Sequence, residues 1–457
     1  MSTAASLSLA EKDQRYALHP FTNLSAHEQN GPFIISRGEG IYVFDEQDNR
    51  YIEGMSGLWC TSLGYNEKRL INAATRQLEK MPFTHMFTHR SNEPAIELSE
   101  KLVSIAPGDI TRAFLVNSGS EAVDMAIKMV WFYHNAIGKP NKKKIISRKR
   151  AYHGVTIASG SLTGLPYVHD GFDLPAIPVI HTETPYLYRV GETDETEADF
   201  ATRLAATLEA DILAADPDTI GAFIAEPVMG AGGAIVPPET YFDKIQAVLK
   251  KYDILFIADE VICGFARTGN MWGSQTYNIN PDIVTCAKQL SSSYLPIGAV
   301  LINQKLYDAF VTGSDQLGMF GSGNTYGGHP ASAAVALETL NIYEERNIVQ
   351  HVRDRSGRFG ERIDALSNHS LVGHSRHVGL IGAIEIVKDK STKEQYPVGD
   401  KTAAKVMAAA KNHGVIVRAV PGDGIAFCPP LIISDEQIDD MFDGIQAALD
   451  DVRRELS

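Results

Sequence analysis

The stretch Ile254-Leu255-Phe256-Ile257-Ala258-Asp259-Glu260-Val261 is an apolar run that ends in two acidic residues. A second run, Asp282-Ile283-Val284-Thr285-Cys286-Ala287, ends at Lys288. Continuous apolar runs that alternate with helical stretches predict a mostly parallel sheet covered on both faces by helices. The pattern recurs in the runs at 113–116, 144–147, 220–225 and 299–302. The sequence therefore predicts an α/β fold.

Lys288 stands at the end of a predicted buried strand. Burial disfavours the ammonium form, and a lysine with a depressed pKa can attack a carbonyl to form a Schiff base. Asp259 ends another strand and is the usual kind of partner for a pyridinium nitrogen. Adjacent residues of an extended segment point to opposite sides, so we expect Asp259 and Val261, rather than Glu260, to face the site. The pair Lys288 and Asp259 suggests pyridoxal 5′-phosphate (PLP).

Charge and composition narrow the classes of partner. The chain has 457 residues and a formal net charge of −14, which disfavours binding to nucleic acid or to anionic membranes. No apolar run reaches the roughly 18–20 residues needed to cross a bilayer, and residues 1–16 lack the features of a signal peptide. The four cysteines lie far apart, without the spacing of a metal site. We therefore expect reduced thiols, no metal and a cytoplasmic protein.

The chain divides into three predicted parts. Residues 1–65 form an N-terminal segment, polar and irregular up to residue 30 and then a small β-meander, which we expect to pack with the last part. Residues 66–330 carry the alternating helices and strands of a large domain. After Pro330 an Ala-rich helix leads into a smaller α+β domain, 331–457. Its last helix has Ser434 as a predicted N-cap, with Gln437 three residues later.

Several short motifs follow the predicted strands. Asn117-Ser118-Gly119-Ser120-Glu121-Ala122 opens a helix whose free N–H groups could bind a phosphate, or it is an ordinary capped helix. Tyr152-His153-Gly154 offers an aromatic ring that could stack on a flat cofactor or pack in the core. Glu226 could order the site or cap a turn. Thr325 offers a hydroxyl for a phosphate, and Arg418 could clamp a carboxylate or lie on the surface.

The run Ile257–Gly269, followed by Ala287-Lys288, resembles the class III, fold-type I PLP-dependent aminotransferases, and more narrowly the ω-amino acid/amine:pyruvate transaminase group. The resemblance extends from His19-Pro20-Phe21 to Cys428-Pro429-Pro430-Leu431. It implies the fold of that class, with a large PLP-binding domain and a smaller α+β domain. Three features depart from the common pattern: Ala266, Gln289 and the segment 322–324. We expect these departures to bear on the substrate range.

The resemblance also implies residue roles. Lys288 would hold PLP and move the substrate proton, and Asp259 would pair with the ring nitrogen. Tyr152 and Val261 would enclose the ring, and His153 and Glu226 would complete its surroundings. Gly119 and Ser120 would bind the phosphate, with Thr325 reaching it from the partner subunit of a homodimer, with tetramers left open. The predicted substrate pocket comprises Phe21, Trp59, Phe87, Tyr152 and Arg418.

These roles predict a transaminase with ping-pong chemistry. An amine or ω-amino acid would leave its nitrogen on the cofactor, and a keto acid, pyruvate by preference, would collect it. An aminomutase or decarboxylase of the same fold, using the same lysine–PLP linkage, is the nearest alternative. A PLP-binding protein without activity is a more distant one. No dinucleotide-binding fingerprint supports a dehydrogenase.

Overall fold

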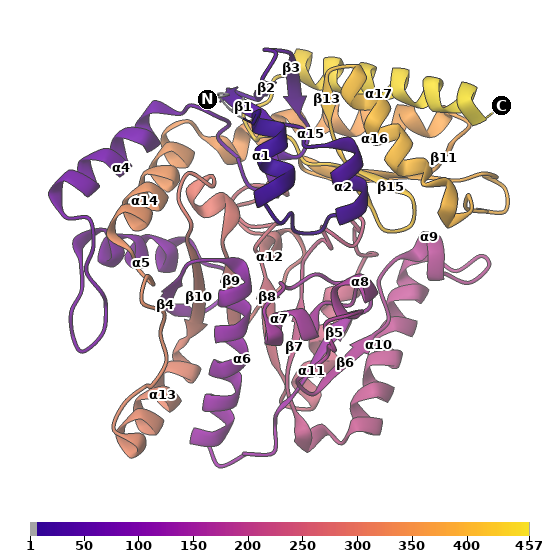
Figure 1. Ribbon diagram of the computed structural model, residues 1–457. Helices are drawn as coiled ribbons and strands as arrows, with labels where there is room; N and C mark the ends of the chain where they lie inside the picture. The colour runs from indigo at the N-terminus through magenta and orange to yellow at the C-terminus, as the bar shows by residue number, and fades with distance from the viewer. Residues whose placement is uncertain (1–6, 457) are drawn as a thin grey trace.

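The central sheet of the larger lobe has seven strands, and helices surround it (Figure 1). The computed structural model describes residues 7–456. The strand order is β4-β10-β9-β8-β7-β5-β6. The strands are β4 (Ile110–Val116), β5 (Lys144–Arg148), β6 (Val179–Thr182), β7 (Ile220–Ala225), β8 (Leu255–Asp259), β9 (Ile283–Cys286) and β10 (Gly298–Asn303).

The predicted mostly parallel sheet is confirmed, and β10 is its exception. Strands β9, β8, β7, β5 and β6 pair in parallel, whereas β10 is antiparallel to both β9 and β4. The connection from β9 to β10 contains one 3₁₀ turn, η2 (Lys288–Ser291), and no crossover helix. An antiparallel neighbour needs no crossover, so the chain can reverse there.

Helices cover both faces of this sheet because its strands are apolar on both sides. On one face α6 (Gly119–Ala136) packs on Ile224 and Ile257, and α13 (Gln304–Leu317) lies beside α6. On the other face α10 (Glu197–Ala215) and α11 (Tyr241–Lys251) pack on Phe223 and Phe256. Successive residues of one strand thus enter different cores, as the twofold alternation of a strand requires.

A second helical group flanks the edge strand β4. Helix α14 (Pro330–Glu345) packs on α4 (Lys68–Lys80) and on α5 (Glu93–Ile105). Short helices complete this lobe: α7 (Ile157–Leu162), α8 (Pro166–His169), α9 (Leu187–Val190) and α12 (Gly273–Thr276), whereas α3 (Ser56–Trp59) follows the N-terminal strands. Several of them follow strands of the central sheet, so they shape its carboxyl edge.

The smaller lobe contains an antiparallel sheet of order β11-β12-β15-β14. Its strands are β11 (Val372–Val378), β12 (Ile381–Ile386), β14 (Arg418–Val420) and β15 (Gly424–Phe427), and its helices are α15 (Ile348–Ala365), α16 (Thr402–Asn412) and α17 (Asp435–Leu456). The Ser434 N–H donates to Gln437 (3.0 Å), and the Gln437 N–H donates to the Ser434 hydroxyl (3.2 Å). This is the predicted capping box at the start of α17.

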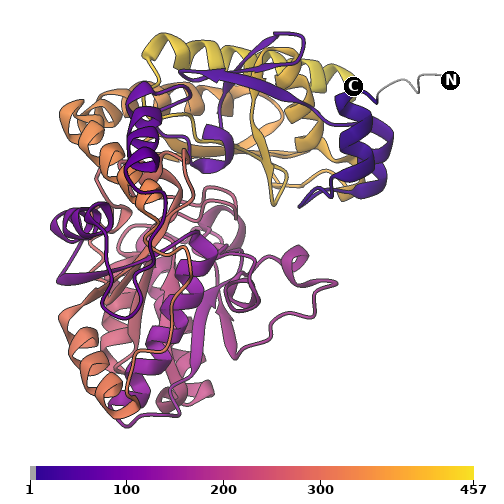
Figure 2. The ribbon, with the colours of Figure 1, turned by 60° about the vertical axis from the view of Figure 1, so that its left-hand side comes forward.

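The N-terminal strands belong to the same lobe as the C-terminus (Figure 2). Strands β1 (Ile35–Glu39), β2 (Tyr42–Asp45) and β3 (Arg50–Glu53) form an antiparallel meander, and β13 (Val415–Ile416) pairs in parallel with β3. One small sheet therefore joins segments from both ends of the chain. The domain boundaries at residues 65 and 330 stay a prediction.

The expectation that the segment before residue 30 is irregular is wrong for two stretches. Helix α1 (Leu9–Tyr16) begins with a capping box between Ser8 and Glu11, and α2 (Leu24–Asn30) is capped by Asn23. Capping and local polar contacts can form short helices without apolar periodicity. Residues 1–6 of the predicted N-terminal segment lie outside the described residues. None of the helices within 7–456 is long and apolar enough to span a membrane.

Candidate active site

Lys288 lies just beyond the carboxyl end of β9, where the chain leaves the sheet. Its φ is +48°, a left-handed conformation that costs a non-glycine residue about 1–3 kcal/mol and that clusters at functional sites. Burial lowers the pKa of Lys288, while the charges of Cys60, Asp259, Glu226 and Cys428 act in the opposite direction. Lys288 therefore loses its proton more readily than a lysine on the surface does, and only the neutral amine can attack a carbonyl.

Asp259 ends β8 and lies opposite Thr285 of β9 in the strand register. Its carboxylate accepts hydrogen bonds from His153 Nδ1 (2.7 Å) and from the Thr285 hydroxyl (3.2 Å). The His153 side chain is fully buried, and its Nε2 has no hydrogen-bond partner among the described residues. The imidazole and the hydroxyl fix the orientation of the carboxylate, which is what pairing with a pyridine nitrogen needs.

Glu260 points to the other side of the strand and has a structural contact set. It accepts hydrogen bonds from the Gly273 N–H (2.9 Å) and from the N–H (2.5 Å) and hydroxyl (2.6 Å) of Ser274, at the start of α12. Burial raises the pKa of Glu260 to about 7. The carboxylates of Asp259 and Glu260 therefore lie on opposite sides of the strand and bond to different parts of the structure.

The N-terminal end of α6 lies next to Val261, in the loop that follows β8. Ser118 caps the helix by accepting from the Glu121 N–H (3.2 Å), while Glu121 accepts from the N–H of Asn117 (2.8 Å) rather than from Ser118. A Cβ on Gly119 would lie 3.0 Å from Val261 Cγ1. Gly119 and Ser120 thus present the first N–H groups of a helix next to Val261, which is a cradle for an anion.

Gly154, in the segment after β5, lies against this end of α6. Its φ is +134°, and a Cβ there would lie 2.6 Å from the Ser120 hydroxyl oxygen. The Val155 N–H donates to the same hydroxyl (3.2 Å). Only glycine allows the two segments to approach so closely.

Glu226 orders the backbone around Tyr152. Its carboxylate accepts from the Tyr152 N–H (3.1 Å) and the Gly230 N–H (2.9 Å), and burial raises its pKa. Tyr152 is half-buried. Burial raises the pKa of Tyr152, Tyr167 adds to that shift, and the guanidinium of Arg418 opposes it. The charges of Tyr167 and Arg418 therefore act on Tyr152.

The predicted substrate residues do not all lie together in one chain. Phe21 lies against Tyr167, with the ring centroids 6.3 Å apart. Burial raises the pKa of Tyr167, and the charge of Arg418 opposes that shift. Trp59 is only 2% exposed and belongs to an apolar cluster with Met55.

Phe87 and Thr325, by contrast, lie on two exposed segments that touch each other. Phe87 is 44% exposed, and a Cβ on Gly323 would meet its ring at 2.9 Å. Within one chain these two residues therefore form a separate outer group.

Sequence reasoning missed two residues of the site, Thr285 and Tyr167, and it named Gln289 only as a departure from the family pattern. Thr285 could have been found from the pairing of β8 with β9, because it stands opposite Asp259. Tyr167 carries no local signal, since its place depends on α8. Gln289 donates hydrogen bonds from its amide to the carbonyls of Ile262 (2.7 Å) and Gly264 (3.0 Å) and so holds the loop after Asp259.

The chemistry of these residues fits PLP. Gly119, Ser120 and the approach of Gly154 suit a phosphate, the oriented carboxylate of Asp259 suits a ring nitrogen, and Lys288 offers an amine of lowered pKa to a carbonyl. The three groups differ in charge and in position, as a phosphorylated pyridine aldehyde requires.

Comparisons with known proteins agree with this arrangement. The sequence profile of the family described as Aminotransferase class-III matches residues 24–449. Gamma aminobutyrate transaminase 3, chloroplastic, of Solanum lycopersicum is 49% identical over 440 residues, which cover 96% of this chain and 84% of that protein. Probable gamma-aminobutyrate transaminase 2, mitochondrial, of Oryza sativa subsp. indica is 51% identical over 423 residues, covering 92% and 85%.

A solved structure of the omega transaminase from Pseudomonas jessenii, in complex with PMP, superposes with a TM-score of 0.96 at 50% identity and covers 98% of this chain and 99% of that one. Together with the profile match along most of the sequence, this likeness settles the family. The chain belongs to the class III aminotransferases, enzymes of PLP fold type I that use pyridoxal 5′-phosphate to transfer amino groups.

Proposed function

We propose that this enzyme takes an amino group from an amine or ω-amino acid and passes it to pyruvate in two half-reactions at one pocket. The observation that carries the proposal is Lys288. Burial lowers the pKa of Lys288, and β9 and β8 bring it and Asp259 to the same edge of the sheet. Bound PLP supplies the carbonyl that receives the nitrogen and the ring that draws electrons from the substrate carbon.

The residues of the chain then have distinct tasks. Neutral Lys288 takes the proton from the substrate carbon next to nitrogen and returns it on the other side of the transfer. Asp259, held by His153 and Thr285, keeps a proton on the ring nitrogen by its negative charge. Because His153 acts through Asp259, it is a positioning residue.

The remaining cofactor residues bind and orient the group. Gly119 and Ser120 would donate to the phosphate, and Val261 and Tyr152 would lie on the two faces of the ring. Glu226 acts from behind, through the backbone of Tyr152. Each of these roles is electrostatic or steric, so none requires a further titrating side chain.

The choice of substrates draws on the relatives. Two similar plant proteins are named as gamma-aminobutyrate transaminases, and another similar structure is described as a transaminase with L-alanine, the amino counterpart of pyruvate. A variant of the similar omega transaminase, changed at a tryptophan, a phenylalanine and an arginine, is described as engineered for enantiopure bulky amines. Trp59, Phe87 and Arg418, three of the five residues of the proposed substrate pocket, are of the same types.

We propose a homodimer in which Thr325 of each chain completes the phosphate site of the other, with Phe87 entering the partner's pocket. Supporting this, Phe83, Met86, Phe87 and Tyr326 form an exposed apolar group around Thr325. Exposed apolar patches of this kind mark interaction sites.

We also propose the domain division at residues 65 and 330 and a cytoplasmic location. The four free cysteines, three of them buried, support a reducing compartment. The mitochondrial and chloroplastic designations belong to the plant relatives.

The test follows the absorbance of the lysine-bound cofactor. An amine donor added alone should bleach this band, and pyruvate should restore it. Lys288→Ala should bind PLP without the band and show no turnover. Continued turnover by Lys288→Ala, or a band that no amine changes, would contradict the proposal.

Arg418→Ala tests the carboxylate clamp. Loss of a charged hydrogen bond, worth about 1.5–3 kcal/mol, should raise the KM for pyruvate about 10- to 150-fold. The KM for an uncharged amine should change by less than about threefold, within the range of surface substitutions of up to about 0.5 kcal/mol. Arg76→Ala, on the exposed face of α4, is the control. Equal effects on both substrates would remove the clamp.

A further inference from the structure

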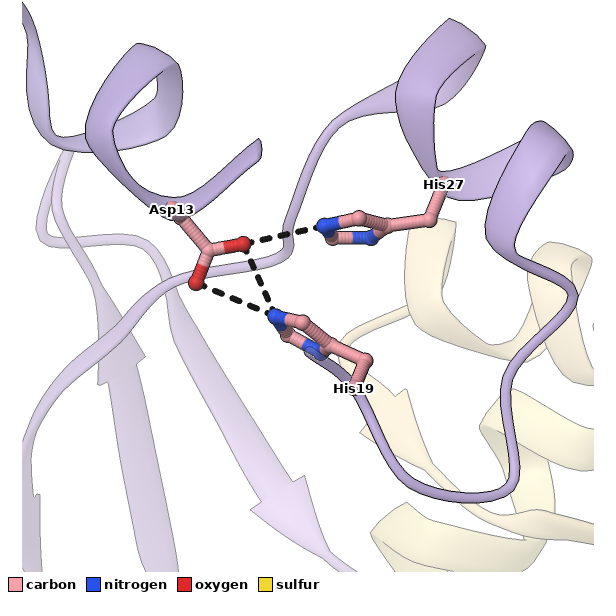
Figure 3. Close-up of side chains that lie close together, drawn as sticks. All are labelled: Asp13, His19 and His27. Carbon is pink, nitrogen blue, oxygen red and sulfur yellow. Dashed lines mark hydrogen bonds and ion pairs between the residues drawn. The ribbon is translucent and has the colours of Figure 1, made fainter. Parts of the chain in front are cut away.

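Two histidines and one aspartate meet in the N-terminal segment, outside the active site (Figure 3). Asp13 belongs to α1, His27 to α2, and His19 to the loop between them. His19 Nε2 lies 2.8 Å from Asp13 Oδ2, and His27 Nε2 lies 3.0 Å from the same oxygen. Figure 3 shows both imidazoles turning a nitrogen toward the carboxylate, and the ring centroids are 4.1 Å apart.

We propose that Asp13, His19 and His27 bind a divalent transition-metal ion, Zn²⁺ or one of similar chemistry, with water in the fourth position. Tetrahedral zinc with bonds of about 2.0–2.1 Å places its ligand atoms about 3.3 Å apart. The Nε2–Oδ2 distances of 2.8 and 3.0 Å need to widen only slightly to admit an ion. Binding through Nε2 leaves each imidazole neutral with its proton on Nδ1, and any proton displaced from Nε2 passes to water. The ion keeps its +2 charge, so the step needs no oxidant or reductant.

The composition of the cluster selects the kind of ion. Two imidazoles and one carboxylate suit zinc, cobalt, nickel or copper rather than magnesium or calcium, which prefer oxygen ligands. The ligand atoms lie within 4.8 Å of one another, and this is the one group of at least three candidate ligands found within residues 7–456. The side chains are partly exposed, 25% for Asp13, 33% for His19 and 10% for His27, so an ion and its water can enter.

The surrounding backbone holds the ligands ready. Gln14, next to Asp13, donates from its amide to the Glu28 carbonyl (2.9 Å) and so ties α1 to α2. The Gly31 N–H donates to the His27 carbonyl (2.8 Å) at the end of α2. These contacts leave the three ligand side chains free to meet, which lowers the entropic cost of closing the site.

Metal binding at this place would fix a pocket residue. The ligands close the loop 13–27, and Phe21 lies within it, with its ring against that of Tyr167. A bound ion would hold Phe21 against the mouth of the pocket. This second step rests on the proposed function, whereas the metal site itself does not.

The first experiment measures Zn²⁺ binding to the full-length, PLP-loaded enzyme by titration calorimetry, with Co²⁺ as a spectroscopic substitute. We expect about one ion per chain and, with Co²⁺, the visible bands of a four-coordinate nitrogen–oxygen site. Asp13→Asn and His27→Gln should each weaken binding at least about 100-fold, the upper end of what the loss of a supporting group costs.

His413→Gln is the matched control, because His413 Nε2 lies 2.7 Å from Asp451 without a second imidazole. It should bind Zn²⁺ as the wild type does. Circular dichroism and thermal unfolding exclude variants that fail to fold. If one ligand variant does not fold, the other still tests the site. The proposal would be overturned if the wild type did not bind Zn²⁺. It would also be overturned if Asp13→Asn and His27→Gln bound Zn²⁺ as tightly as the wild type.

The second experiment compares the KM for an amine donor with Zn²⁺ and with a chelator. We expect Zn²⁺ to lower this KM at least about threefold in the wild type and to leave it unchanged in His27→Gln. Zinc binding without a change in KM would overturn the control of Phe21 and retain the site. An enzyme without transaminase activity would still give the binding result, so the two proposals fail separately.

Discussion

The narrow gap between Gly119 and Val261 predicts how tightly the cofactor is held. In Gly119→Ala the new Cβ would lie 3.0 and 3.1 Å from the two Val261 methyl carbons. Carbon atoms prefer separations of about 3.5–4.0 Å, so the valine must retreat by about 0.5 Å or more. Val261 is half-buried, and the cofactor ring is proposed to lie against it.

Overpacking of this kind costs about 1–3 kcal/mol. Without cofactor the valine can move into the space proposed for the ring, so the thermal stability of the apoenzyme should change little. With cofactor that space is taken, and the dissociation constant of PLP should rise about 5- to 150-fold. The assay titrates apoenzyme with PLP and follows the absorbance of the lysine-bound form.

Two further variants isolate the contact. Val261→Ala removes both methyl groups, so Gly119→Ala in that background should cost less than about 0.5 kcal/mol, which leaves a coupling of about 0.5–3 kcal/mol. Gly357→Ala is the matched control, because Gly357 lies in α15 with no atom within 4 Å of the added Cβ. If Gly119→Ala lowers PLP affinity equally with and without the Val261→Ala change, the steric argument is refuted.

Three other predictions concern the loop after Asp259, the buried carboxyl group of Glu53 and the residue that pairs with the ring nitrogen. Gln289→Ala leaves the buried carbonyls of Ile262 and Gly264 without their donor and should lower the free energy of unfolding by about 2–4 kcal/mol in urea titrations. A loss below about 0.5 kcal/mol would contradict this role. Burial raises the pKa of Glu53 from 4.5 to about 7, so the folded state holds this proton more tightly than the unfolded state. Its contribution is full below pH 4.5 and is lost as the pH rises through about 7, by up to about 3 kcal/mol, and Glu53→Gln should flatten the measured pH dependence of unfolding. A slope that Glu53→Gln leaves unchanged would argue against it. Asp259→Asn should slow the amine half-reaction about 10²–10³-fold in stopped-flow measurements while PLP stays bound, and an undiminished rate would exclude the proposed pairing.

Local sequence patterns predict six of the seven strands of the central sheet, because each of the six contains a continuous apolar run. They miss β6, in which two apolar residues are followed by His181 and Thr182. They do not predict the direction of β10, since the run Ala299–Ile302 reads as a strand in either direction. They also miss the pairing of β13 with β3, because a two-residue strand carries no periodic signal. The helices α1 and α2 escape for a related reason: their stability comes from caps rather than from an apolar face.

The site divides in the same way. Alternation along the strand separates Asp259 from Glu260, and the structure places them in different environments. The partners of Asp259 are harder to predict, because His153 lies 106 positions away in the sequence and meets it only through the strand order. The Asp13 cluster matches no ligand motif, since its members come from two short helices and a loop.

The pairing of β3 with β13 also determines the order in which the lobes can fold during synthesis. Strand β3 ends at Glu53 and its partner begins at Val415, so most of the chain is translated between them. At about 5–20 residues per second, β3 waits roughly 20–70 s with an unpaired edge after it leaves the ribosome. The central sheet can close during that interval, because its last strand ends at Asn303. The lobe that contains β3 and β13 is therefore the last to be completed, and until then the unpaired edge of β3 can pair with another chain.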